Sequence, residues 1–324
     1  MMQEIGINEF ASLRIGQVED TDAGTGCTVF LCPEGMRAGL DVRGGGPASR
    51  EPLLLDPLMA AQEIHAIVLA GGSAFGLNAA GGVMEFLEER GIGLDVGVTK
   101  VPLVVQADLF DLTVGDPFRR PDAAMGYAGA KQAFEAPNYR DGNYGAGCGA
   151  TVGKLRGMEY CMKSGIGSFA VALGDLKLGA VAAVNALGDV FDHRTGCRLA
   201  GLLGEDRRTP VSTADTLLQG VYRASFRPGE NTTLGVIFTN ATFDKASLCK
   251  LAGMAQDGLA RSIRPVHTDL DGDSVFAVSL GEVKADRVLA GTLAAEVMSE
   301  AITRAVRSAE GAYGFPAARD ILSE

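Results

Sequence analysis

The clearest alternation of hydrophobic and polar positions lies in the last third of the chain. Residues 232–241 (TTLGVIFTNA) and 274–280 (SVFAVSL) are short, apolar and rich in β-branched or aromatic side chains, which is typical of buried strands. Residues 245–263 and 285–310 repeat their apolar positions at helical spacing, and the second segment is long and amphipathic. This third of the chain therefore predicts strands and helices in alternation.

The first two thirds carry weaker but similar signals. The first 45 residues predict short strands separated by glycine turns, and residues 192–230 predict a loop-rich segment. The other predicted elements are strands at 63–70 and 101–112, helices at about 77–90 and 122–136, and a hairpin over 168–187 that turns at Gly174 and Asp175. No clean strand–helix–strand rhythm emerges, so the pattern favours a layered α/β fold with mixed or antiparallel sheets in one domain, 1–324.

Composition and charge narrow the function. Apolar residues make up 47% and charged residues 21% of the chain, as in ordinary globular proteins. The net charge of -11 and the lack of a basic stripe argue against nucleic acid as a partner. No secretory signal and no apolar run of about 18 residues is present, so we expect a cytoplasmic protein without a membrane partner. The six cysteines fit no metal-binding spacing, and no cofactor is expected.

A glycine-rich turn in residues 66–82 (AIVLAGGSAFGLNAAGG) follows a predicted strand and opens a predicted helix. Such a turn can cradle a phosphate or a dinucleotide. The glycine spacing matches neither the dinucleotide fingerprint nor the phosphate-binding loop. A tight strand-to-helix turn is the favoured interpretation, and a non-catalytic nucleotide-binding protein stays open as an alternative.

Two polar residues stand out in otherwise apolar or glycine-rich surroundings. Lys154 ends the loop GAGCGATVGK (145–154), where burial could lower its pKa and make it a proton acceptor. Asn185 lies in the apolar segment AVNALGD, where its amide could donate to an oxyanion. The alternative for Lys154 is a surface lysine, and the alternative for Asn185 is a structural asparagine.

The segment around residues 228–241 could hold a nucleophile. An N-terminal threonine is activated by its own α-amine, whose ordinary pKa of about 7.7–8.0 leaves much of it neutral near pH 7.5.

Downstream, Asp269, Asp271 and Asp273 alternate in DLDGDS, but the glycine position and the absence of a glutamate at the twelfth position exclude a calcium loop. In an extended segment Asp271 and Asp273 would share one face and could orient an ammonium group. His267 is the best general-base candidate among the three histidines.

The order of these segments resembles one known family. AGGSAFGLNAAGGVMEFLEERGIG, VPLVVQADLFDLTVGD, GAGCGATVGK, KSGIGSFA, AVNALGDV, NTTLGVIFTNA and GLARSIRPVHTDLDGDSVFAV resemble, in sequence, the L-aminopeptidase/D-esterase family of self-processing peptidases, near the branch of the nylon-oligomer hydrolases. The resemblance covers about residues 15–310, and NTT and HTDLDGDS are its most specific parts.

The resemblance implies a mechanism and a set of site residues. It implies cleavage between Asn231 and Thr232, giving fragments 1–231 and 232–324, with Thr232 as the nucleophile. It places Lys154 and Asn185 in the active site and makes Asp271 and Asp273 the acidic pair that positions the nucleophile. Phe110 stands where some relatives carry a tyrosine, and Cys148, after Gly147, stands where threonine or serine is common. We count Phe110, Gly147 and Cys148 as candidate pocket residues.

The implied fold is an α-β-β-α sandwich of the N-terminal-nucleophile hydrolase type. The implied partners are a small peptide, amide or ester substrate and further copies of the same chain, in a homo-oligomer such as a tetramer. The competing enzymatic interpretation is acyl transfer of the ornithine acetyltransferase type, in which an amine rather than water accepts the acyl group.

Overall fold

A ten-stranded mixed sheet forms the centre of the computed structural model, which describes residues 2–220 and 230–321. The pairs β15–β17 and β5–β8 are parallel and the other pairs are antiparallel, which confirms the predicted mixed sheet. In order across the sheet the strands are β1 (Met2–Ile5), β11 (Ile166–Leu173), β12 (Leu176–Asn185), β15 (Thr232–Ala241), β17 (Ser274–Val283), β3 (Thr25–Val42), β5 (Ile64–Ala70), β8 (Val104–Asp108) and β4 (Ala48–Arg50), with β2 (Arg14–Asp20) paired to β3.

The long strand β3 joins two halves of this sheet. Its residues 25–31 pair with β2 and β5, whereas its residues 37–42 pair with β17, and the register shifts between Leu31 and Met36. The sequence predicted two short strands here, one ending at Cys32 and one beginning at Met36, and the intervening Pro33 and Gly35 are residues that commonly end strands. The structure corrects this prediction: both residues lie at the register shift, where the strand passes from one half to the other without ending.

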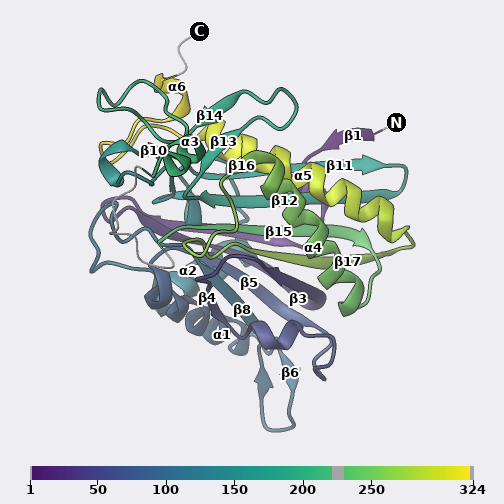
Figure 1. Cartoon of the computed structure of the whole chain (residues 1–324). Coiled ribbons are helices and arrows are strands. Elements are labelled where there is room, and N and C mark those ends of the chain that lie inside the picture. The colour runs from purple at the N-terminus through teal and green to yellow at the C-terminus, as the bar shows by residue number, and fades with distance from the viewer. Residues whose placement is uncertain (1, 221–229, 322–324) are drawn as a thin grey trace.

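The two halves pack face to face and are covered by helices on their outer faces (Figure 1). Phe30 and Ile67 of one half meet Val236 and Phe276 of the other in a buried apolar layer. The outer helices are α4 (Lys245–Ser262) and α5 (Arg287–Ser308) on the β11–β12–β15–β17 half, and α1 (Ala79–Glu88) and α2 (Ala123–Glu135) on the other half. This is the expected α-β-β-α arrangement.

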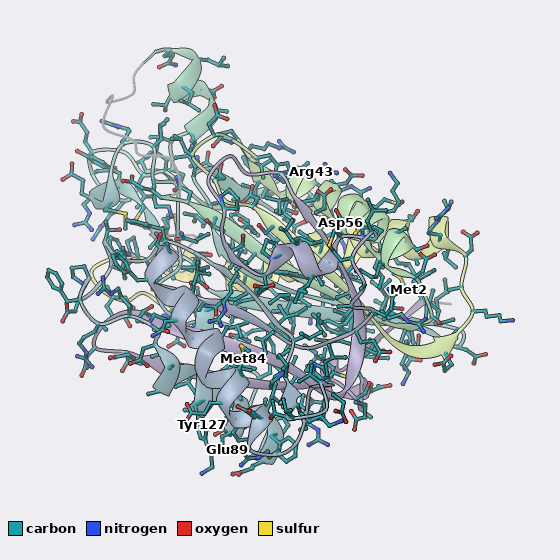
Figure 2. The ribbon with its side chains drawn as sticks, turned by 90° about the horizontal axis from the view of Figure 1, so that it is seen from below. Met2, Arg43, Asp56, Met84, Glu89 and Tyr127 are labelled. Carbon is teal, nitrogen blue, oxygen red and sulfur yellow. The ribbon has the colours of Figure 1, made fainter. Side chains whose placement is uncertain are left out.

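Helices α1 and α2 lie directly against each other. A Cβ at Gly82 of α1 would collide with the carbonyl of Ala123 at the start of α2, so a glycine is required for this approach. At the other end, the Tyr127 hydroxyl donates to Glu89 over 2.7 Å, and the two side chains lie together at the outer surface in Figure 2. Close helix contacts of this kind account for some of the 44 glycines in the chain.

Of the other predicted elements, some are confirmed and some differ in length. The hairpin over 168–187 is confirmed as β11 and β12, whereas the predicted strand 101–112 is shorter, since β8 covers 104–108 alone. Residues 192–230 contain more regular secondary structure than predicted, and their part 221–229 lies outside the described residues.

The small elements are β6 (Leu94–Asp95), β7 (Lys100–Val101), β9 (Thr151–Val152), β10 (Met162–Lys163), β13 (Asp189–Phe191), β14 (Arg198–Ala200), β16 (Ile263–Arg264), α3 (Thr213–Leu218) and α6 (Ala318–Ile321). Over the described ranges, no helix has both the length and the hydropathy to cross a membrane.

Candidate active site

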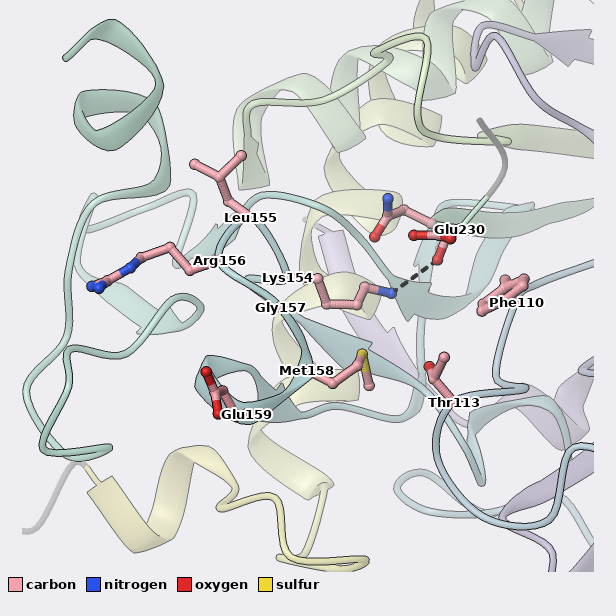
Figure 3. Close-up of a pocket in the computed structure, with 10 residues that line it drawn as sticks. Phe110, Thr113, Lys154, Leu155, Arg156, Gly157, Met158, Glu159 and Glu230 are labelled. Atoms are coloured by element: carbon pink, nitrogen blue, oxygen red, sulfur yellow. Dashed lines mark hydrogen bonds between the residues drawn. The ribbon is translucent and has the colours of Figure 1, made fainter. Parts of the chain in front are cut away.

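The sheet brings three of the predicted site residues together. Thr232 is the first residue of β15, Asn185 is the last residue of β12, and the two are partners in the antiparallel pairing of these strands. Lys154 follows β9, and its Nζ donates to the Asn185 side chain and, as Figure 3 shows, points toward Glu230. Residues that are 31 to 78 positions apart in the sequence, by 185 − 154 and 232 − 154, thus share one site.

Lys154 is buried and donates hydrogen bonds to backbone and side-chain oxygens. Its Nζ lies 2.8 Å from Asn185 Oδ1, 3.0 Å from the Asn185 carbonyl oxygen and 3.5 Å from the Glu230 carbonyl oxygen. Burial lowers the pKa of Lys154 from 10.5 to about 8, because an ammonium group is poorly solvated there. A lysine with this pKa is partly neutral near physiological pH and can accept a proton.

The carbonyl oxygen of the Asn231–Thr232 peptide accepts two hydrogen bonds. The Thr232 hydroxyl donates to the carbonyl oxygen of Asn231, and the Gly272 N–H donates to the same oxygen over 2.7 Å. Asn231 and Thr232 are each 1% exposed. The hydroxyl is therefore close to the preceding peptide but closed off from external substrates while the chain is uncut.

Asp273 holds the backbone just after Thr232, whereas Asp271 binds residues of two neighbouring loops. Asp271 accepts from the Leu187 N–H at 3.2 Å and from Thr268, while Asp273 accepts from the Thr233 N–H at 2.7 Å. Burial, followed by the neighbouring Asp273, raises the pKa of Asp271 from 3.8 to about 6. Asp273 thus contacts the peptide after Thr232.

His267 supports Asp273. Its Nδ1 is 3.0 Å, and its backbone nitrogen 3.1 Å, from Asp273 Oδ2, and its backbone is left-handed, with a φ of 57°. The carboxylate thus links the imidazole to the Thr233 N–H. In this structure His267 positions Asp273, which in turn fixes the peptide after Thr232; its role as a general base stays a prediction.

We expect His267→Ala to lower the free energy of unfolding by about 1–3 kcal/mol, because it removes a hydrogen bond to a buried carboxylate. It should also slow any reaction at Thr232, since Asp273 loses its support. His267→Asn is the matched control, because an asparagine amide can replace Nδ1–H and asparagine tolerates the left-handed backbone. Denaturant melts and rate measurements on both variants check this, and equal behaviour of the two variants would contradict the positioning role.

A pocket of about 330 Å³ opens beside this cluster. Phe110, Lys154 and Asn231 line it, as expected of active-site residues, and Figure 3 shows Phe110 and Lys154 at its wall. Gly147 and Cys148 are absent from the lining: both are buried, with Cys148 Sγ 3.4 Å from the Tyr313 hydroxyl. The structure thus does not support the pocket role predicted for these two residues. The lining residues that sequence reasoning missed are Thr113, Leu155, Arg156, Gly157, Met158, Glu159 and Glu230.

Most of these missed residues could not be found from their type alone. Glu230 had a usable signal, since it directly precedes the Asn231–Thr232 pair. Met158 and Thr113 carry no catalytic signature, and only the fold of their loops brings them to the pocket. The sequence analysis thus identified candidate reactive groups but not the pocket-lining residues that would contact a substrate.

Both polar atoms of the Asn185 side chain make hydrogen bonds in this structure. Its side-chain nitrogen donates to the Phe110 carbonyl over 2.8 Å, and its side-chain oxygen accepts from Lys154 and from the Thr151 N–H. Asn185 therefore ties the pocket wall at Phe110 to the lysine and to the end of β12.

The glycine turn at residues 71–76 binds a carboxylate of the same chain. The Gly72 N–H donates to Asp111 Oδ1 over 2.7 Å, and Asp108 is also buried beside the turn. Burial raises the pKa of Asp111 to about 6. A phosphate would meet acidic groups here and not free N–H donors, so the turn gives no support to nucleotide binding.

The fold matches that of a solved protein. The structure aligns, with a TM-score of 0.61 and 16% identity, to the L-aminopeptidase D-Ala-esterase/amidase of Ochrobactrum anthropi, over 92% of this chain and 84% of the other. That protein is described as a prototype for the serine aminopeptidases and as a new variant among the Ntn hydrolase fold. The α-β-β-α sandwich is therefore an Ntn-hydrolase-like fold.

Sequence comparison supplies the family. Residues 6–319 match peptidase family S58, and the chain belongs to this family of hydrolases. It is 38% identical to an uncharacterised aminopeptidase of Mycobacterium leprae over 96% of this chain and 92% of the relative. It is 29% identical to a 6-aminohexanoate-oligomer endohydrolase of Kocuria sp. over 92% of this chain and 85% of the relative.

Proposed function

We propose that this S58 hydrolase cleaves its own chain between Asn231 and Thr232 and then uses Thr232 as the nucleophile of an aminopeptidase or amidase. The observation that carries the proposal is the contact of the Thr232 hydroxyl with the Asn231 carbonyl, beside a buried lysine whose pKa is about 8. A nucleophile, a base and the bond to be cut thus lie within one buried cluster.

Self-cleavage proceeds by an N-to-O acyl shift. Thr232 Oγ bonds to the carbonyl carbon of Asn231 while its proton passes to neutral Lys154, directly or through water. The carbon–nitrogen bond then breaks, and the leaving nitrogen takes the proton. The resulting ester is hydrolysed by water, which returns the hydroxyl to Thr232 and leaves a carboxylate on Asn231. The products are fragments 1–231 and 232–324, the second of 324 − 231 = 93 residues.

Turnover repeats the same chemistry on an external carbonyl. The new α-amine of Thr232, assisted by Lys154, takes the hydroxyl proton and delivers it to the leaving amine or alcohol of the substrate. Asn185 can supply an oxyanion donor once a substrate replaces its contact with Phe110. Water then releases the acyl group from Thr232.

The substrates we propose are small peptides, amides or esters. The names of the relatives support this class, since they include aminopeptidases and an endohydrolase of 6-aminohexanoate oligomers. Phe110 and Met158 give the pocket apolar walls, next to the polar groups of Lys154 and Glu230. We also propose that the chain forms a homo-oligomer, as the family resemblance implies.

The rate of self-cleavage should rise with pH. Lys154 acts as a base only when neutral, so the active fraction grows as the pH approaches its pKa of about 8. We expect a rise of about tenfold per pH unit below about pH 7 and a plateau above about pH 9. Full-length chain made by cell-free synthesis at low pH and shifted to a series of pH values gives the profile. A flat profile from pH 6 to 9 would exclude Lys154 as the base.

Intact-mass spectrometry under denaturing conditions tests the proposed function. Two masses that correspond to 1–231 and 232–324 are expected, followed by release of amine from small aminoacyl amides by the cleaved protein. A stable full-length mass together with hydrolysis of these amides would separate the activity from self-cleavage and refute the proposal.

A further inference from the structure

Gly272 lies between the two buried aspartates and directs its N–H at the cleavage site. Its nitrogen is 2.7 Å from the carbonyl oxygen of Asn231, which belongs to the peptide that self-cleavage attacks. The Thr232 hydroxyl contacts the same oxygen. A hydrogen-bond donor is therefore in place on this carbonyl before any reaction begins.

The surrounding strands hold this donor in position. Asn231 and Asp271 form a parallel bridge just before β15 and β17, in which the Asn231 N–H also donates to Leu270 over 3.2 Å. The N–H of Gly272 cannot turn away without breaking this bridge. Fixed donors of this kind stabilise a developing oxyanion without reorganisation, which makes them effective in catalysis.

Other polar groups of the site are committed elsewhere. The Asn185 amide donates to Phe110, and Lys154 donates to Asn185 and to the carbonyl of Glu230. Within residues 2–220 and 230–321, the hydrogen bonds to the Asn231 carbonyl oxygen come from Gly272 and Thr232 alone. Since Thr232 is the nucleophile, Gly272 is left as the donor.

The space at position 272 also requires glycine. A Cβ there would lie 2.7 Å from Thr232 Oγ and 2.9 Å from the Gly46 carbonyl oxygen, both well inside van der Waals contact. The backbone of Gly272 can approach the nucleophile and the carbonyl this closely because it carries no side chain.

We propose that the Gly272 N–H is the oxyanion donor of self-cleavage. When Thr232 Oγ bonds to the Asn231 carbonyl carbon, the π-electron pair moves to the oxygen, and the hydrogen bond from Gly272 stabilises that negative charge. The charge returns to the carbon as the carbon–nitrogen bond breaks and the nitrogen takes the proton that the base received. This assignment rests on the proposed self-cleavage at Asn231–Thr232 and adds the group that stabilises its intermediate.

The test replaces the N–H without adding a side chain at position 272. Incorporation of glycolic acid at position 272 replaces the peptide N–H with an ester oxygen and adds no side chain. We expect self-cleavage to slow by about 10²–10³-fold, as for the loss of one oxyanion donor elsewhere. The matched control is phenyllactic acid at Phe276, which removes an N–H four residues further along the chain, inside β17 where it pairs with β15. The control should melt at a lower temperature but cleave at the unmodified rate.

The outcomes separate this proposal from the function on which it rests. If the unmodified chain cleaves and Thr232→Ala does not, the nucleophile is established independently of Gly272. The oxyanion assignment is then overturned if the ester at 272 cleaves at the unmodified rate, or if both esters slow cleavage equally. Failure of the unmodified chain to cleave under any condition would instead overturn the proposed function.

Discussion

Thr232→Ala should leave the chain at full length and lower its hydrolytic activity on the order of 10⁴-fold or more, as for removal of the nucleophile in other hydrolases. The substitution removes one hydroxyl and one methyl group from a buried strand position, so the fold should persist. Gel electrophoresis and intact mass after prolonged incubation measure the cleavage, and amine release measures the turnover.

Thr232→Ser is the matched control for this experiment. It keeps the hydroxyl beside the Asn231 carbonyl and, after cleavage, the adjacent α-amine. We expect it to cleave and to turn over substrate, more slowly than threonine because the smaller side chain is less restricted in rotation. Cleavage of the alanine variant at the same bond would show that Thr232 is not the nucleophile.

Lys154→Met should have the second-largest effect, a loss of about 10²–10⁴-fold in the rate of self-cleavage. Methionine keeps an unbranched apolar stem in the buried site but cannot accept the proton of Thr232. The rise of the rate with pH near 8 should disappear in this variant, because the lysine amine causes it. Time courses of cleavage at several pH values measure both effects.

Lys163→Met is the matched control for the loss of a buried lysine. Lys163 is equally buried, and burial lowers its pKa to about 7, but its Nζ donates to the carbonyls of Gly147, Ala150 and Ser164 and it does not line the pocket. Its removal should lower the melting temperature while each folded molecule still cleaves. If both lysine variants cleave equally slowly, the effect at position 154 is one of stability and not of catalysis.

Elements with a strong periodic pattern were predictable from the sequence. Strands β15 and β17 and helices α4 and α5 begin and end within a few residues of their predicted bounds, because each buries one face or all of its side chains in the layers. The long strand β3 was not predictable. Its turn signals, Pro33 and Gly35, mark a change of pairing partner, and the partner is set by contacts distant in the sequence.

Some features of the candidate site could likewise be predicted from the sequence, and others depend on the fold. Residue type drew attention to Lys154 and Asn185, but only the pairing of β12 with β15 places Asn185 beside Thr232. Gly272 was visible as the glycine between two aspartates, yet its spacing served only to exclude a calcium loop. Its contact with the Asn231 carbonyl arises from the bridge between β15 and β17, which no local pattern encodes.

The position of the proposed cut within the sheet would have a consequence for assembly. Strand β15 begins at Thr232 and lies between β12, of the first fragment, and β17, of the second. The two fragments would therefore share the central sheet and both sides of its apolar layer, and would stay together as an interlocked pair. The uncut chain can refold by itself at any dilution, whereas the cleaved protein must first bring two separate chains together. Self-cleavage would thus make folding a one-time event, after which recovery from denaturation depends on protein concentration.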